Sequence, residues 1–279
     1  MKQNFELIGI EKIKYIRCRR RDFSNLTVNA FTTRLGGISE NYYKSLNLSF
    51  NVNDKESYVL ENRKRILDIL DIDYRKIVSA QQIHKDRITV VERGDEGKGA
   101  FKYLEGISGS DALITNKPGI PLLMCYADCV PIIILDPIKK AIGLIHGGRR
   151  GTQLKIAFKT IIKMKQTFGT EPNSCLAAIF PSIGPCCYNF TNQEEIIDWL
   201  NEKNIYNKIV VKKEKNSWSI DLRKANYLQL IKSGMKTKNI FISEKCTADN
   251  HELFFSHHRD NGRTGRMAAI FMLKENRKE

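Results

Sequence analysis

The sequence contains no hydrophobic run long enough to cross a membrane. Its 279 residues include no stretch that approaches the ~18 consecutive apolar residues of a membrane span. The opening residues, MKQNFELIGIEK, also lack the apolar segment of a secretory signal peptide. We therefore expect a cytoplasmic protein that does not act on membranes. Hydrophobic residues make up 42% of the chain and charged residues 28%, so a globular core is expected.

The cysteine pattern excludes two common kinds of framework. The seven cysteines are odd in number and unevenly spread, which argues against a disulfide scaffold and for reduced thiols. Paired CxxC motifs are missing, so a zinc ribbon is excluded and any metal site must be assembled from distant segments. The adjacent Cys186 and Cys187 are either a redox pair or two buried, inert thiols, and we prefer the second interpretation.

Motifs for nucleic-acid binding are missing as well. The chain carries a net charge of +15, and its densest basic cluster spans Arg17–Arg21. Charge of this sign suits nucleic acids or anionic substrates. No RRM, KH or zinc-finger signature accompanies the cluster, and the Walker spacing GxxxxGK[ST] is absent. We interpret the charge as a solvated basic surface first and as attraction of anionic substrates second.

Hydrophobic patterning predicts a mixture of strands and helices. Apolar residues recur at helical spacing in segments that we interpret as helices, at 54–70, 154–168, 193–201 and 221–233. Short apolar runs predict strands, the clearest at 28–33, 77–80, 87–92, 175–180 and 239–243, with a lysine-rich hairpin over 208–218. No repeat or linker divides the chain. We predict a single α/β domain over residues 1–279, with a mixed β-sheet core flanked by helices.

One stretch, residues 119–152, is expected to form the centre of the molecule. The Ile- and Val-rich run 130–135 predicts a buried strand, and 141–145 is expected to pair with it across a five-residue connection. Cys129 precedes the first strand and His146 follows the second, so both lie at the same end of this hairpin. A thiolate beside an imidazole is a plausible start of a zinc site, whose other ligands must come from elsewhere.

Other candidate residues carry meaning only in combination. His84 follows a short strand, and Arg34 lies in a glycine turn that suits either an anion or an ordinary hairpin. Residues 147–152 place glycines and arginines at a strand-to-helix turn, which suits phosphate. Asp111, before a short strand, is either a turn residue or part of a site. Near the C-terminus, the possible anion-binding side chains are His258, Arg259, Arg263 and Arg266.

An ordered set of short motifs resembles a known family. The motifs are TTRLGGIS from Thr32, QIH from Gln82, GSDALIT from Gly109, YADCVP from Tyr126, HGGRRG from His146, SIGPCCY from Ser182, and FFSHHRD followed by TGR. Each motif alone is weak. Taken together and in this order, from about residue 30 to 270, they resemble the laccase-domain family. This family was formerly called polyphenol oxidase and is now associated with purine nucleoside phosphorylase activity.

The resemblance implies a metal site. Similar members of the family bind zinc through the histidine of Q-x-H, the cysteine of A-D-C and the first histidine of H-A-G-W-R-G. Residue by residue, these ligands correspond to His84, Cys129 and His146. Three protein ligands leave one tetrahedral position open, as in catalytic zinc sites, where zinc lowers the pKa of bound water to ~7 or polarises a substrate oxygen. Zinc is the expected metal, and copper is disfavoured.

The resemblance also implies an activity. It is phosphorolysis of adenosine, inosine, guanosine and methylthioadenosine to a free base and a sugar 1-phosphate, with deamination of adenosine beside it. The expected partners are purine nucleosides and phosphate. Arg34 is the first candidate for binding phosphate, followed by Arg150 and Arg259. Asp128, next to Cys129, either transfers protons or orients a histidine. The preferred nucleoside and the oligomeric state, monomer or dimer, stay open.

Several positions depart from the family's pattern. Arg149 replaces the tryptophan of H-A-G-W-R-G, and Gly147 replaces its alanine. Tyr126 stands for the threonine before A-D-C, and His258 for the first arginine of S-x-R-R-D. Phe180-Pro181 occupies a position where glycine-proline is common. None of these changes removes a zinc ligand, so we expect them to affect substrate range rather than metal binding.

Three other functions are alternatives to this activity. The family's older name suggests a copper-type phenol oxidase, but a multicopper oxidase needs many more than the five histidines present. A peptidoglycan-editing amidase, an activity attributed to some bacterial relatives, would release an amino acid from a cell-wall precursor without phosphate. A basic RNA-binding protein would bind in a salt-dependent manner. It would leave the ordered set of cysteine and histidine motifs unexplained, so nucleic acid is disfavoured as a partner.

Overall fold

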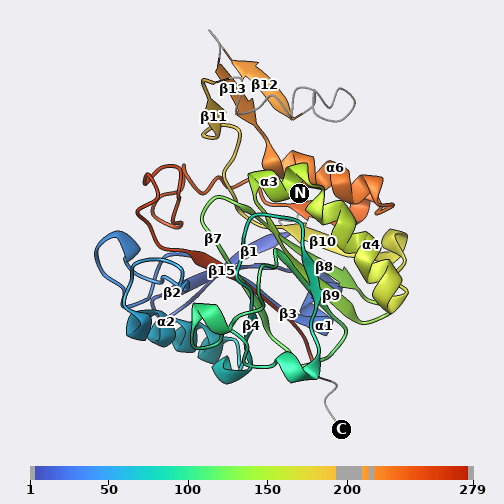
Figure 1. Cartoon of the computed structure of the whole chain (residues 1–279), viewed down its shortest axis with the longest axis horizontal. Helices are drawn as coiled ribbons and strands as arrows, with labels where there is room; N and C mark the ends of the chain where they lie inside the picture. Colours follow the sequence, from blue (N-terminus) through green and yellow to red (C-terminus); the bar gives the residue numbers. More distant parts are fainter. Residues whose placement is uncertain (1–3, 193–208, 214–216, 276–279) are drawn as a thin grey trace.

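The computed structural model describes residues 4–192, 209–213 and 217–275. Most of its strands belong to two six-stranded sheets (Figure 1). In spatial order, the first sheet contains β1 (Phe5–Ile10), β2 (Ile13–Cys18), β3 (Thr27–Thr32), β15 (Met267–Leu273), β7 (Leu122–Tyr126) and β4 (Val78–Ser79). The second contains β14 (Ile240–Ile242), β10 (Leu176–Ile179), β8 (Val130–Asp136), β9 (Ala141–Gly147), β6 (Ala112–Thr115) and β5 (Ile88–Val90).

Both sheets are mixed. The parallel pairs are β4 with β7, β5 with β6 and β10 with β14, while the other pairs in these sheets are antiparallel. A third, three-stranded sheet projects from the body of the molecule (Figure 1). It consists of β11 (Asn189–Phe190), β13 (Ser217–Ile220) and β12 (Val210–Lys213).

The two large sheets pack face to face, with helices on their outer faces. Successive side chains of a strand point to opposite faces, and β8 shows the consequence. Its Ile133 and Leu135 pack in one cluster with Met124 and Phe271 of the first sheet. The intervening side chains of β8 pack in a second cluster with helices α4 and α6. Because both faces are covered, β8 is buried along its whole length, which explains its continuous apolar run.

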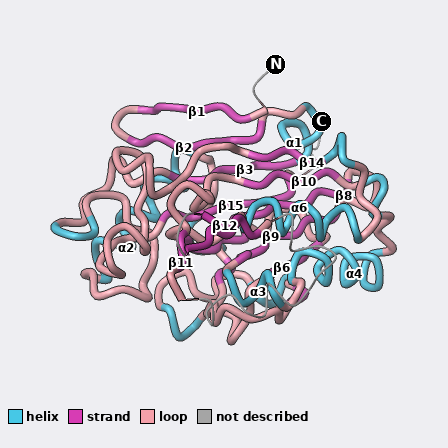
Figure 2. Tube along the Cα trace, turned by 90° about the horizontal axis from the view of Figure 1, so that it is seen from above, coloured by secondary structure: helices cyan, strands magenta, loops and turns pink. Residues whose placement is uncertain are grey.

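The helices cover the two outer faces. Helix α2 (Glu56–Ile69) packs Ile66 and Leu67 against the first sheet. Helices α4 (Ile156–Phe168) and α6 (Leu222–Lys232) pack against the second sheet on the opposite side of the molecule (Figure 1). Figure 2 shows the strands crossing the middle of the molecule between these layers. Two short α-helices, α1 (Arg21–Leu26) and α3 (Arg149–Gln153), are also described.

The predicted mixed α/β fold is confirmed, with the strands divided between two large sheets. The central hairpin is confirmed as well, but β9 runs on through His146, which pairs with Pro131 of β8. The predicted helix 154–168 is confirmed as α4, which begins two residues later, at Ile156, because Lys155 adopts a left-handed backbone conformation. The predicted helix 193–201 and part of the hairpin 208–218 lie outside the described residues. Within the described part, no helix has the length and apolar character required to span a bilayer.

Candidate metal centre

The three ligands implied by the motif resemblance come together in the structure. His84 lies in the connection between β4 and β5, Cys129 at the corner between β7 and β8, and His146 near the end of β9. Their ligand atoms all lie within 4.8 Å of one another. The two imidazole rings are nearly perpendicular, with centroids 4.8 Å apart. Three segments that are distant in sequence therefore converge on a site that offers two nitrogens and one sulfur.

The carboxylate of Asp111 holds two of these ligands in place. It accepts hydrogen bonds from the backbone N–H groups of Ile83, His84 and Lys85, at 3.2, 3.0 and 2.8 Å. These bonds fix a turn in which His84 adopts a positive φ of 58°. Asp111 also lies 2.8 Å from His146 Nδ1. A protonated Nδ1 facing this carboxylate leaves Nε2 of His146 as the metal-binding nitrogen.

The absence of a side chain at Gly148 allows the ligands to approach one another. A Cβ atom at this position would lie 3.0 Å from Cδ2 of His84 and 3.2 Å from Sγ of Cys129. Both distances are shorter than ordinary van der Waals contacts. Gly148, the second glycine of the HGGRRG motif, is therefore required for the geometry of the centre.

Cys129 and His146 form a charge pair when no metal is bound. Burial by itself would raise the pKa of the Cys129 thiol, but the imidazoles of His146 and His84 lower it to about 6. Burial likewise opposes protonation of His146, but the Cys129 thiolate and the Asp111 carboxylate raise its pKa to about 9. The centre therefore supplies a thiolate at neutral pH, which is the form of cysteine that binds metal.

Two cavities meet at this centre. One, of about 250 Å³, is called the Arg266 cavity and is lined by Ser49, Phe50, Asn51, Arg63, Ser79, Tyr103, Cys125 and Arg266, among others. The other, of about 590 Å³, is called the Tyr188 cavity and is lined by Asp128, Arg149, Arg150, Ile183, Tyr188, Phe190, Leu222 and His258, among others. Both cavities share a wall formed by His84, Ala127, Cys129 and His257. A metal ion at the centre would thus face both spaces.

Comparison with known families decides the family of the chain. Residues 28–274 match the family described as multi-copper polyphenol oxidoreductase laccase. The chain belongs to this laccase-like family. Curated relatives include the purine nucleoside phosphorylase YlmD of Bacillus subtilis, 34% identical over 89% of each chain. The protein of the same name from Geobacillus stearothermophilus is 35% identical over 94% of this chain and 95% of its own length.

Solved structures of similar laccase-like proteins share the fold. The YlmD structure from Geobacillus stearothermophilus has a TM-score of 0.91 at 32% identity and covers 98% of this chain and all of its own. The hypothetical protein YfiH of Bacillus licheniformis has a TM-score of 0.90 at 34% identity, covering 97% of this chain and 99% of its own. The architecture described above is therefore the architecture of the family.

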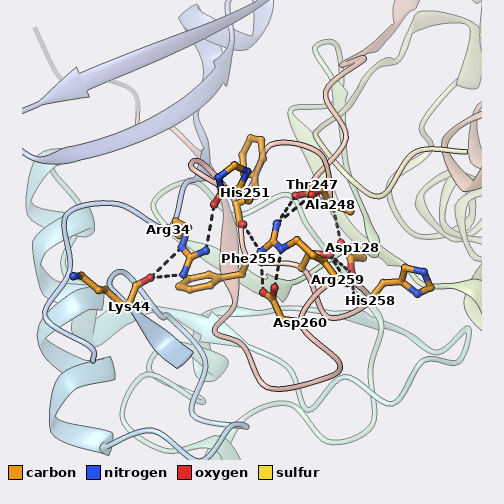
Figure 3. A network of polar contacts seen from close by, with 12 residues as sticks. Arg34, Lys44, Asp128, Thr247, Ala248, His251, Phe255, His258, Arg259 and Asp260 are labelled. Carbon is orange, nitrogen blue, oxygen red and sulfur yellow. Dashed lines mark hydrogen bonds and ion pairs between the residues drawn. The ribbon is translucent and has the colours of Figure 1, made fainter. Parts of the chain in front are cut away.

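Asp128 connects three segments of this laccase-like chain. Its carboxylate accepts hydrogen bonds from the hydroxyl groups of Thr247 and Ser256, at 2.6 and 2.9 Å, and from the backbone N–H of His258 at 2.7 Å (Figure 3). Among these contacts of Asp128, the only histidine group is the backbone N–H of His258, which is not a candidate ligand. The carboxylate that contacts a ligand imidazole, that of His146, belongs to Asp111. Asp128 also lines the Tyr188 cavity. Its predicted role in proton transfer stays a prediction.

The structure separates the three arginines predicted to bind phosphate. Arg34 donates to the backbone carbonyls of Lys44 and His251 and stacks on Phe255, 4.7 Å from its ring centroid (Figure 3). Arg259 binds three backbone carbonyls and pairs with Asp260. Neither is among the residues that line the two cavities, whereas Arg150 lines the Tyr188 cavity. The contacts of Arg34 and Arg259 hold loops together.

Sequence reasoning missed two residues that line the cavities. His257 lies in the shared wall, where burial and the charge of Arg266 lower its pKa and so favour the neutral ring. It occupies a variable position of the S-x-R-R-D pattern, so the motif carried no signal for it. Arg63 lies on α2, and its buried side chain reaches into the wall of the Arg266 cavity. Helical periodicity alone marked α2 as a surface helix.

Two of the positions that depart from the family's pattern, Arg149 and His258, line the Tyr188 cavity. Arg149 stacks over Phe190 at 5.6 Å, and the ring of His258 lies edge-on to Tyr188 at 5.7 Å. Tyr126 instead is buried beside His146, and its hydroxyl donates to the carbonyl of Ile145 at 2.9 Å. The departures thus leave the candidate ligands intact and change one wall of the larger cavity.

Replacing Gly148 by alanine is expected to weaken metal binding at the centre. The added Cβ must displace His84 or Cys129, and disturbed ligand support typically costs roughly tenfold or more in metal affinity. Competition with a chelator measures the change. The matched control is Gly94→Ala, because a Cβ at Gly94 meets nothing within 4 Å. Equal metal affinities of the two variants would contradict the assignment.

In metal-free protein, His146 is expected to titrate near pH 9 rather than near its ordinary 6.5. The Asp111 carboxylate stabilises the charged imidazole, so Asp111→Asn must lower this pKa. Below about pH 9 the imidazolium is present, and it is lost as the pH rises through that value. Nitrogen NMR of the histidine side chains follows this titration. A pKa of His146 that does not change in Asp111→Asn would show that the carboxylate does not act on the ring.

Proposed function

We propose that the chain is a zinc-dependent purine nucleoside phosphorylase that also deaminates adenosine. Its curated relatives carry the name purine nucleoside phosphorylase over nearly the whole chain. The observation that carries the proposal is the position of the candidate metal centre in the wall between two cavities of different character. A phosphorylase must bring two substrates, a nucleoside and a phosphate ion, to one point.

Zinc fits the ligands better than copper does. Two imidazoles and one thiolate with a fourth position open match catalytic zinc sites. Copper in a His₂Cys site serves electron transfer, whereas this centre faces two spaces large enough for substrates. The family description mentions several coppers, yet the chain has only five histidines, too few for a multicopper oxidase. When bound, zinc supplies a Lewis acid and lowers the pKa of a coordinated water.

The Arg266 cavity is the proposed phosphate site. Arg63 is buried and Arg266 is partly buried, and burial lowers the pKa of both guanidinium groups, which nevertheless stay charged. The hydrogen bonds of Arg63 go to the carbonyls of Leu48, Gly99 and Ala100, which carry no formal charge. A buried cation among neutral acceptors is costly, and an anion in the cavity offsets that cost.

The Tyr188 cavity is the proposed nucleoside site. Tyr188 and Phe190 offer aromatic faces and Ile183 and Leu222 apolar surface, which suits a purine base. The ribose then lies at the shared wall. A phosphate oxygen forms the new bond to C1′ as the C1′–N9 bond breaks, and its electron pair leaves with the base, which takes up a proton.

His257 is the proposed proton-handling residue at the shared wall. Its Nδ1 lies 3.5 Å from Nη2 of Arg266, a contact that favours the tautomer with the proton on Nε2. Nε2–H can then donate a hydrogen bond to the leaving base. In deamination, the ring can take a proton from the attacking water only in the opposite tautomer, in which Nε2 carries no proton and the contact of Nδ1 with Arg266 is given up.

Product analysis tests the proposed activity. Zinc-loaded protein is expected to form hypoxanthine and ribose 1-phosphate from inosine only when phosphate is present. It is expected to form inosine from adenosine with or without phosphate. Chromatography of the reaction mixtures separates these products. Cys129→Ala removes the thiolate ligand and is expected to abolish both reactions, and full activity of a metal-free Cys129→Ala protein would contradict the mechanism.

A split in the Michaelis constants tests the assignment of the two cavities. Arg266→Gln is expected to raise KM for phosphate roughly tenfold or more, since a hydrogen bond to a charged group contributes about 1.5–3 kcal/mol. Tyr188→Leu removes an aromatic face and is expected to raise KM for inosine about threefold to tenfold. Each variant is the control for the other. If Arg266→Gln changes only KM for inosine, the cavities are assigned the wrong way round.

A further inference from the structure

A second group of metal-ligating side chains lies away from the candidate centre. Cys186 and Cys187 belong to the loop between β10 and β11, and Cys246 and Asp249 to the loop after β14. One ligand atom from each of the four side chains lies within 4.8 Å of the others. Cys186 is exposed and Cys187 is partly exposed, so the prediction of two buried thiols is wrong. The two thiols instead face a third thiol and a carboxylate.

The Asp249 carboxylate bridges two of these thiols. Sγ of Cys186 lies 3.0 Å from Oδ2, and Sγ of Cys187 lies 2.9 Å from Oδ1. On the other side of the cluster, the backbone N–H of Gly184 donates to Sγ of Cys246 at 3.2 Å. Sulfurs of metal-bound cysteines typically accept such backbone hydrogen bonds. The four side chains are thus already oriented toward a common point.

Gly184 allows this cluster to close, as Gly148 does at the first centre. A Cβ at Gly184 would lie 3.0 Å from Sγ of Cys186 and 3.4 Å from Cβ of Cys246. The same Cβ would lie 2.8 Å from Nη2 of Arg223. The guanidinium of Arg223 is therefore next to the cluster and offsets part of the negative charge that thiolates would bring.

We propose that these three cysteines and Asp249 form a second, structural binding site for a thiophilic divalent cation, with zinc as the ion that fits. Three sulfurs and one oxygen complete a tetrahedron without an open position, which is typical of structural zinc. Zinc–sulfur bonds of about 2.3 Å place tetrahedral sulfur atoms roughly 3.8 Å apart, which is compatible with ligand atoms that all lie within 4.8 Å of one another. On binding, the three thiols lose their protons to the solvent, and no electrons are transferred.

The second site would brace one wall of the Tyr188 cavity. The loop that carries Cys186 and Cys187 also carries Tyr188, which lines that cavity. The segment that carries Cys246 continues into Thr247, whose N–H donates to the carbonyl of Ser182 and whose hydroxyl donates to Asp128. A cation here would cross-link two loops that meet beside the first centre. The inference concerns metal content and does not rest on the proposed activity.

The competing interpretation of this cluster is a disulfide between Cys246 and one of its neighbours. A disulfide forms only with loss of two electrons to an oxidant, whereas metal binding needs none. Both a bound metal and a disulfide lower the number of free thiols. Under non-reducing conditions, a chelator restores the thiols that a metal had bound but does not restore those of a disulfide. Thiol counting with and without a chelator therefore separates the two.

Metal counting tests the second site. Protein prepared under reducing conditions and loaded with zinc is expected to contain about two equivalents. The double variant Cys186→Ser/Cys187→Ser is expected to retain about one, held at His84, Cys129 and His146. Cys129→Ala is also expected to retain about one, held at the second site. Cys18→Ala is the matched control, because Cys18 is buried away from both clusters, and it keeps both equivalents.

Cadmium NMR of the unmodified protein keeps the test independent of whether the variants fold. The cadmium shift moves downfield with each added thiolate, so two resonances are expected, one from a site with three thiolates and one from a site with a single thiolate. A single resonance, one equivalent of zinc in the unmodified protein, or an unchanged metal count in the double variant would overturn the proposal. Failure of inosine phosphorolysis would leave it intact.

Discussion

The carboxylate of Asp111 is the contact on which the candidate centre depends. It binds the turn that carries His84 through three backbone N–H groups and the ring of His146 through Nδ1. The antiparallel register of β8 and β9 then brings Cys129, at the start of β8, beside His146. Because β6, which follows Asp111, is hydrogen-bonded to β9, all three ligands are supported by one sheet. The hydrogen bonds of this sheet therefore also fix the positions of the ligands.

The cavities on the two sides of this centre are lined by side chains of different chemical character. The Arg266 cavity is lined by guanidinium groups from α2 and from the segment before β15, whereas the Tyr188 cavity is lined by aromatic rings from the loop after β10 and from β11. Cys186 and Cys187 of the proposed second site lie in the loop that also carries Tyr188, so a cation bound there would hold this loop. Under the proposed function, metal chemistry and substrate recognition would therefore depend on different sets of side chains.

The sequence allowed the hairpin and the main helices to be predicted, because each depends on a local pattern of apolar residues. It did not predict the division into two sheets, since which strands pair is decided by contacts between distant segments. Cys129 and His146 were paired from the hairpin alone, but His84 required the motif resemblance, because its turn is fixed by the distant Asp111. The importance of Arg63 and His257 was not visible, since one belongs to an ordinary amphipathic pattern and the other to a variable motif position. The contact between Cys246 and Cys186 was not predictable either, because these two residues meet only through tertiary packing.

The measurement that tests the account most directly is anomalous diffraction at the zinc absorption edge from crystals of zinc-loaded protein. An anomalous peak is expected from a zinc ion bonded to Nε2 of His146, Sγ of Cys129 and a ring nitrogen of His84, at distances of about 2.0–2.3 Å. This peak is also expected to lie in the wall shared by the Arg266 and Tyr188 cavities. An unoccupied position between these three side chains, in crystals of protein that converts inosine with phosphate, would contradict the central claim.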